Sequence, residues 1–190
     1  MKVYMFTDCI IDPHDSNVEC DNSYGEIECD ISGEQYVDLI RLCCKYSSVF
    51  SVIVNVPDMD IVVEMDKFRI DRPENIQFKH GYYMSKNAEP NSQFYKVCPE
   101  LCDIIIEKAN SIYEWLNGWG FRNPEDPTFY REDGSVFFTS VIHDGEVFLL
   151  PRDDEDVSIV INNKYWREVD PNSITQRQIN FMLNPSKMHD

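Results

Sequence analysis

The stretch TFYREDGSVFFTSVIHDGEVFLL, residues 128–150, decides the fold of this chain. Runs of aromatic and β-branched residues, which favour strands, are separated in it by two Asp-Gly pairs, Asp133-Gly134 and Asp144-Gly145. Asp-Gly between such runs is a strong hairpin signal, because the tight turns that match the twist of paired strands need positive φ angles. The stretch therefore predicts a three-stranded antiparallel meander, with strands at 128–131, 136–142 and 146–150.

The segments before the meander predict further strands and helices. Runs of β-branched residues, or apolar residues at every second position, indicate strands at 2–6, 26–31 and 49–56. We expect the last of these to be a central strand, which Pro57 ends. Apolar residues at helical spacing indicate helices at 33–46, at 100–117 and, with a strand as the alternative, at 58–71. Loops are expected where turn-forming and polar residues gather, at 7–25 and, with one strand, at 72–96.

The ends of the predicted helices carry signals of their own. Ser32 and Gln35 have the spacing of a capping box, in which the cap side chain accepts a hydrogen bond from the first helical turn. Pro99 suits the first turn of a helix and Gly118 suits its end, so 100–117 is expected to be the longest helix. Beyond the meander, helical patterns recur at 153–162 and 173–183.

The composition is that of one folded domain. The chain has 190 residues, of which 43% are hydrophobic and 13% aromatic, enough for a single core and too many for a disordered chain. We therefore predict one domain over residues 1–190, with the meander and the last helices lying from about residue 124 onward. The fold class is α+β, a mainly antiparallel sheet with helices packed on one face.

Negative charge is concentrated near the start of the chain. The formal net charge is −17, and residues 1–40 hold ten acidic residues against one lysine. Nucleic acid binds where Lys or Arg neutralises its phosphates, so this charge excludes direct nucleic-acid binding. Glu26, Glu28 and Asp30 alternate with apolar residues, which places their carboxylates about 7 Å apart on one face of the predicted strand. These three side chains are candidate contacts for a basic protein partner.

Trp119 is the other candidate contact. It lies between two glycines, beyond the predicted end of the helix at 100–117, whereas the aromatic residues around it suit core packing. An exposed Trp is a typical anchor of protein interfaces. We therefore expect Trp119 to supply local affinity for the partner.

No residue pattern in the sequence indicates a catalytic residue, a metal site or a cofactor. Cys9, His14, Cys20 and Cys29 lack the close pairs of zinc-binding motifs, and none of the four histidines lies in a catalytic signature. Seven cysteines, an odd number, indicate free thiols in a reducing compartment. Because no stretch approaches the roughly 20 apolar residues of a membrane span, we expect a cytoplasmic protein without membrane association.

Residues 119–130, WGFRNPEDPTFY, and residues 133–143, DGSVFFTSVIH, are similar to a segment of small bacterial proteins. Some of those proteins look like immunity proteins that accompany secreted toxins. The similarity covers about thirty of the 190 residues and includes no catalytic motif. It implies a cytosolic α+β protein, often acidic, that works by binding.

The leading hypothesis is a non-enzymatic binding protein of the immunity type, whose acidic surface neutralises a basic toxin. Two alternatives stay open. Rows of carboxylates can imitate phosphates and occupy a basic groove, as a phage-type nucleic-acid-mimic inhibitor does. A metal-dependent hydrolase would instead use His14 with Asp8 and Asp12.

Overall fold

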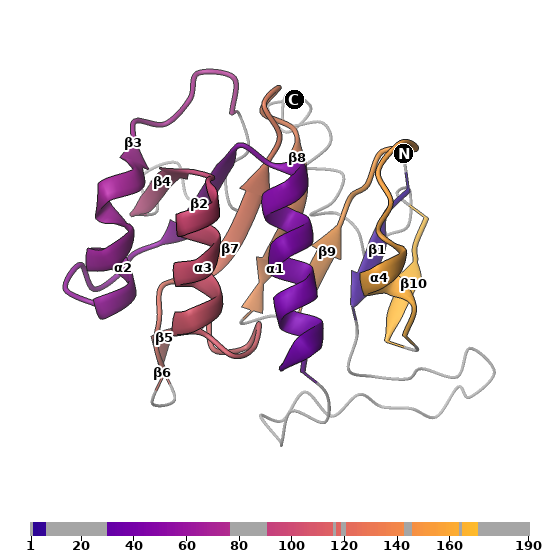
Figure 1. Ribbon diagram of the computed structural model, residues 1–190, viewed down its shortest axis with the longest axis horizontal. Coiled ribbons are helices and arrows are strands. Elements are labelled where there is room, and N and C mark those ends of the chain that lie inside the picture. The colour runs from indigo at the N-terminus through magenta and orange to yellow at the C-terminus, as the bar shows by residue number, and fades with distance from the viewer. Residues whose placement is uncertain are drawn as a thin grey trace, which may run out of the picture.

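The protein forms one large sheet with helices on one of its faces (Figure 1). A computed structural model describes residues 2–6, 30–76, 91–115, 117–118, 121–142, 146–163 and 165–170. Within these ranges the sheet has eight strands, all antiparallel, and four α-helices lie in front of it in the view of Figure 1. The predicted fold class is therefore confirmed.

The strands of the large sheet are short: β1 (Tyr4–Phe6), β2 (Val49–Ile53), β3 (Arg69–Ile70), β4 (Ser92–Lys96), β7 (Glu125–Tyr130), β8 (Val136–Val141), β9 (Glu146–Leu149) and β10 (Trp166–Glu168). Their spatial order is β10-β1-β9-β8-β7-β2-β4-β3. A separate pair consists of β5 (Asn117–Gly118) and β6 (Phe121–Arg122). β1 is thus paired on both sides with strands that come much later in the chain.

The predicted meander is confirmed. β7, β8 and β9 pair antiparallel, with Phe129 opposite Phe138 and Phe138 opposite Leu149. Gly134, in the first turn, has a φ of 81°, the positive value that the sequence predicts for this turn. The second turn, at Asp144-Gly145, lies outside the described residues.

β7 starts earlier than the sequence predicts, at Glu125. Asp126 takes a left-handed φ of 57°, and the pairing of β7 with β2 shifts its register at this point. A bulge of this kind accommodates Pro127, which has no N–H to donate to the strand pairing. The Asp126 carboxylate accepts a hydrogen bond from the N–H of Ile142 at 2.8 Å, and this bond offsets part of the backbone strain.

The helices are α1 (Glu34–Tyr46), α2 (Asp60–Met65), α3 (Pro99–Lys108) and α4 (Ser158–Ile161), with a 3-10 turn, η1 (Asp66–Phe68), after α2. The main core lies between them and the sheet, where the ring centroid of Phe50 is 4.6 Å from that of Phe129 and 5.8 Å from that of Trp115. Because side chains alternate along a strand, Val49 faces the other side of the sheet, where it joins a smaller apolar cluster.

The helix predicted at 100–117 is wrong in its second half. Ala109 takes an extended backbone, with φ −135° and ψ 141°, and ends α3. The N–H of Ile112 then donates to the carbonyl of Ile31 at 3.0 Å, across a long interval of sequence. Ile112 and Trp115, whose spacing suggested a helix face, are both fully buried but do not lie in a helix. The pairing of this segment with Ile31 overrides its local helical pattern. As a result α3 is shorter than predicted, and α1 is the longer of the two helices.

The predicted capping box is also wrong. α1 begins at Glu34 with Gly33 as its N-cap, and no side chain caps the helix. Ser32 forms an isolated β-bridge with Ser111, which removes it from the cap position. Gly33 has φ 58° and ψ −131°, a conformation that glycine alone adopts easily, and its N–H donates to the carbonyl of Asn110 at 3.1 Å.

The remaining predictions meet mixed outcomes. The central strand predicted at 49–56 is confirmed as β2, which lies between β7 and β4, but it ends at Ile53. The helix predicted at 58–71 exists as α2 and η1, and its last residues form β3 instead. Asp30 and Ile31 belong to no strand. The predictions for 7–25, 26–29 and 173–183 lie outside the described residues.

The helix predicted at 153–162 is reduced to the single turn of α4. The residues before α4 are not helical, and one of them, Glu155, pairs with a buried arginine instead. Glu155 forms a bidentate ion pair with Arg131, from Nε to Oε1 at 2.6 Å and from Nη2 to Oε2 at 2.6 Å. The guanidinium also donates to the carbonyls of Val136 at 2.6 Å and Leu150 at 2.7 Å, and lies 5.1 Å from the ring centroid of Phe137. The pair is almost fully buried, with side-chain exposures of 6% and 8%.

Glu155→Ala is expected to lower the free energy of unfolding by about 3–5 kcal/mol, because it leaves a buried guanidinium without its counter-charge. Burial by itself raises the pKa of Glu155, but hydrogen bonds from Arg131 and from the backbone N–H of Arg152 outweigh it and lower the pKa. The stabilisation is therefore present above the ordinary pKa of glutamate and is lost as the pH falls through the lowered pKa of the folded state. Urea unfolding at several pH values measures both effects.

The matched control is Glu168→Ala, which removes an exposed ion pair with Lys2 whose N···O distance is 3.7 Å. This change should cost less than about 1 kcal/mol. Equal losses in the two variants would show that the buried pair contributes no more than a surface one.

Candidate functional site

Asp30, one of the predicted contact residues, lies just before α1 and is partly buried. Its carboxylate accepts a hydrogen bond from the backbone N–H of Tyr113 at 3.4 Å and another from Ser111. Burial raises the pKa of Asp30, and these two hydrogen bonds oppose the rise. The side chain thus joins the start of α1 to the segment after α3.

The other predicted contacts, Glu26, Glu28 and Trp119, lie outside the described residues, so their part in a site with Asp30 stays a prediction. The same holds for all four histidines and for the residues of the hydrolase alternative. Within the described ranges, no three His, Cys, Asp or Glu side chains are arranged to hold a metal ion. Every helix in those ranges is too short or too polar to cross a lipid bilayer.

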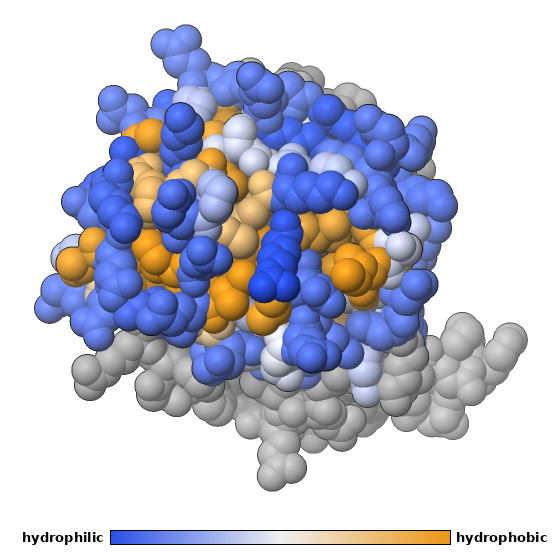
Figure 2. Space-filling view, in the orientation of Figure 1, coloured by the Kyte–Doolittle hydropathy of each residue, from blue (hydrophilic) through white to orange (hydrophobic). Residues whose placement is uncertain are grey.

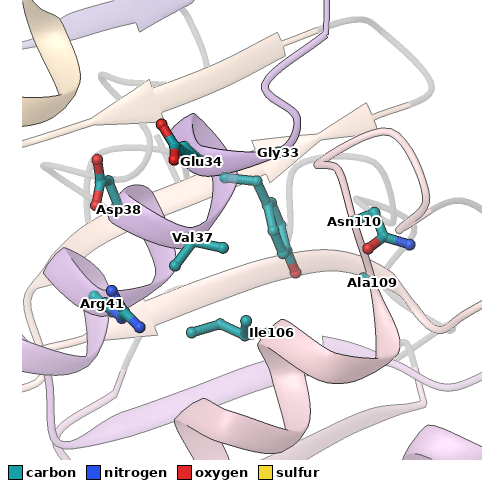
Figure 3. Close-up of a pocket in the computed structure, with 9 residues that line it drawn as sticks. Gly33, Glu34, Val37, Asp38, Arg41, Ile106, Ala109 and Asn110 are labelled. Atoms are coloured by element: carbon teal, nitrogen blue, oxygen red, sulfur yellow. The ribbon is translucent and has the colours of Figure 1, made fainter.

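An open groove of about 580 Å³ lies between the first turns of α1 and the end of α3 (Figure 3). Val37 and Ile106 extend into the space between the two helices, and Arg41 lies beside them. The carboxylates of Glu34 and Asp38 stand at the rim, on the α1 side. The groove therefore combines an apolar floor with a charged edge.

Buried hydrogen bonds fix the base of this groove. The hydroxyl of Tyr36, on α1, donates to the carbonyl of Ile105, on α3, at 3.3 Å, and accepts from the indole N–H of Trp115 at 2.9 Å. Burial raises the pKa of Tyr36, which keeps its phenol neutral. Since Tyr36 and Trp115 are fully buried, α1 and α3 are held at a fixed separation here.

The exposed side of α3 carries a row of carboxylates: Glu100, Asp103 and Glu107, which we call the acidic ridge. Residues spaced by three and four lie on one face of a helix, so the three side chains point the same way, away from the core. None of them forms a salt bridge with a described residue. On the neighbouring face of α3, Lys108 bridges to Glu64 of α2 at 2.6 Å, which ties the two helices together.

The helical layer as a whole is acidic. Residues 30–46, 58–70 and 99–114 contain eleven acidic and five basic side chains. Figure 2 shows this face as hydrophilic surface interrupted by apolar areas. Val63 of α2 and Ile159 of α4 are 61% and 63% exposed. Such a mixture of charge and scattered apolar contacts is found at protein–protein interfaces.

Comparison of the chain with protein-family models, with curated proteins and with solved structures finds no match. The geometry and charge of the described residues therefore carry the functional argument.

The acidic ridge could have been predicted from the sequence, because Glu100, Asp103 and Glu107 have helical spacing inside a predicted helix. The groove could not. A helix continued to residue 117 would run past the point where Ala109 and Asn110 turn to form the end of the groove.

Tyr36→Phe is expected to lower the free energy of unfolding by about 1–3 kcal/mol, because it leaves the buried indole N–H of Trp115 without its acceptor. Tyr95→Phe is the control. The Tyr95 hydroxyl donates at 2.7 Å to the side chain of Gln93, which is only partly buried and can bond to water instead. Thermal or urea unfolding compares the two variants, and a loss at position 95 as large as that at 36 would contradict the role of this bond.

Proposed function

We propose that this protein is a non-enzymatic binding protein that docks onto a basic protein through its acidic helical face. The observation that carries the proposal is the acidic ridge, a row of exposed carboxylates on the rigid helix α3. It belongs to a chain with a net charge of −17, whose field attracts a positively charged partner and repels nucleic acid and anionic membranes.

The position of the ridge favours binding rather than a structural role. Its carboxylates form no salt bridge with a described residue, and Glu100 accepts a hydrogen bond from Cys98. They are solvent-exposed, which keeps the cost of forming new ion pairs at the rim of an interface small. The nearby apolar side chains of the helical face supply the buried contacts that charge alone does not provide.

A cytoplasmic immunity protein that neutralises a basic toxin is the kind of protein that we propose. Electrostatic complementarity chiefly raises the rate of association, which suits an inhibitor that must reach its target quickly. The ridge presents carboxylates from a rigid helix, so the partner meets them in a fixed arrangement. The remaining acidic residues of the chain extend the same field.

The triple variant Glu100→Gln, Asp103→Asn, Glu107→Gln is expected to bind its partner with a roughly tenfold lower association rate at low salt. The probe is the purified product of the neighbouring gene, the place where a toxin for an immunity protein is encoded. Stopped-flow or surface-based kinetics at several salt concentrations measures the rate. The dependence of the rate on salt should also become flatter.

The matched control is Asp71→Asn, Glu74→Gln, Glu132→Gln, which removes the same charge from exposed loop residues. These loops meet where the Asn75 side chain donates to the carbonyl of Glu132 at 2.9 Å, away from the helical face. The control should change the rate less than about twofold. If both variants slowed association equally, the effect would come from net charge alone, and the acidic ridge would not be the binding surface.

A further inference from the structure

Four cysteines of the described chain gather where α1 and α3 meet, and all four are free thiols: Cys43, Cys44, Cys98 and Cys102. The first two lie near the end of α1, Cys98 is the N-cap of α3, and Cys102 lies one turn further along it. Cys43 and Cys102 are buried in the main core, and Cys44 and Cys98 pack against it. We call these four residues the thiol cluster. The proposed function makes no use of it.

The packing of the two helices selects one pair from this cluster. Val37 and Ile106 both extend into the space between α1 and α3 (Figure 3). Cys44 lies seven residues after Val37, on the same face of α1, and Cys102 lies four residues before Ile106, on the same face of α3. Since α1 and α3 run in opposite directions, the two cysteines form the next level of contacts along this seam, and their side chains hydrogen bond to each other.

The two thiols are chemically unequal. A hydrogen bond from Cys44 lowers the pKa of Cys102 against the effect of burial, with the charge of Arg41 acting in the same direction and that of Asp103 against it. The hydrogen bond to Cys102 and burial both raise the pKa of Cys44. Cys102 also lies in the N-terminal half of α3, where the helix dipole favours a thiolate. Cys102 is thus the better nucleophile, and the thiol of Cys44 lies next to it.

We propose that Cys44 and Cys102 form a reversible disulfide when the protein meets a hydroperoxide, with Cys102 as the attacking and Cys44 as the resolving residue. The Cys102 thiolate attacks one oxygen of the peroxide and the O–O bond breaks, which gives a sulfenic acid and hydroxide; the hydroxide takes up the proton that Cys102 released on forming the thiolate and becomes the first water. The Cys44 sulfur then attacks the Cys102 sulfur, the S–O bond breaks, and hydroxide leaves with the Cys44 proton as a second water. Two thiols are oxidised by two electrons, and hydrogen peroxide is reduced to two waters.

The surroundings suit a small oxidant. Cys102 is 8% exposed and Cys44 is partly buried, so a hydroperoxide reaches them more easily than a protein or a bulky disulfide does. The new bond would join α1 to α3 and close the chain between residues 44 and 102. Closing so long a loop restricts the unfolded chain, so the oxidised protein should be the more stable form.

Treatment of the reduced full-length protein with a slight excess of hydrogen peroxide, followed by alkylation, tests the proposal. Mass spectrometry of the unreduced digest should show a peptide that links Cys44 to Cys102 as the main product, and dithiothreitol should remove it. In Cys44→Ser, no such link can form, and dimedone should capture a sulfenic acid on Cys102. A different main pair in the native protein, or no disulfide at all, would overturn the assignment.

Cys98→Ser is the matched control, because Cys98 lies in the same cluster but outside the proposed pair. The Cys98→Ser variant should still form the disulfide between Cys44 and Cys102. Loss of this disulfide in the variant would assign the chemistry to Cys98. A second measurement needs no variant. The Tm of the native protein should rise on the order of 5 °C after oxidation and return after reduction, whereas an unchanged or lower Tm would contradict a cross-link between α1 and α3.

Discussion

The guanidinium of Arg131 occupies the point where the first hairpin of the meander meets the chain that follows its last strand. A charge buried to this degree is tolerated only when its donors are satisfied, and here Glu155 and the carbonyls of Val136 and Leu150 accept from it. β7, β8 and the end of β9 are thereby fixed relative to one another. The other strands and the helices build outward from this fixed centre.

The sequence predicts those elements whose signals are local. Asp133-Gly134 marks the first hairpin because a positive φ is needed at one residue, and the run from Val49 marks a central strand because its side chains are buried on both faces. The end of α3 could not be predicted in this way. It depends on the bond between Ile112 and Ile31, residues that become neighbours only when α1 has packed. The groove, which that turn creates, was hidden for the same reason.

The two layers of the molecule differ in what they contribute to the structure. The sheet, its aromatic core and the Arg131–Glu155 pair supply the rigid part, and the helical layer presents charge to the solvent. The groove and the acidic ridge lie at different places on α3, one beside α1 and the other facing outward. Hydrogen bonds at Tyr36 and the ion pair between Lys108 and Glu64 keep α1, α2 and α3 in register, so the surface charge is displayed from a fixed frame.

The place of β1 in the sheet also has a consequence for biosynthesis. Tyr4 pairs with Leu149 of β9 on one side and with Glu168 of β10 on the other, so both partners of this strand are synthesised after all the other described strands. At roughly 5–20 residues per second, a ribosome needs on the order of ten seconds between β1 and its neighbours. During that time the strand is without its partners, and its three residues are too few to form a sheet by themselves. The described sheet is therefore complete only after the ribosome has passed residue 168, when β1 pairs with β9 and β10.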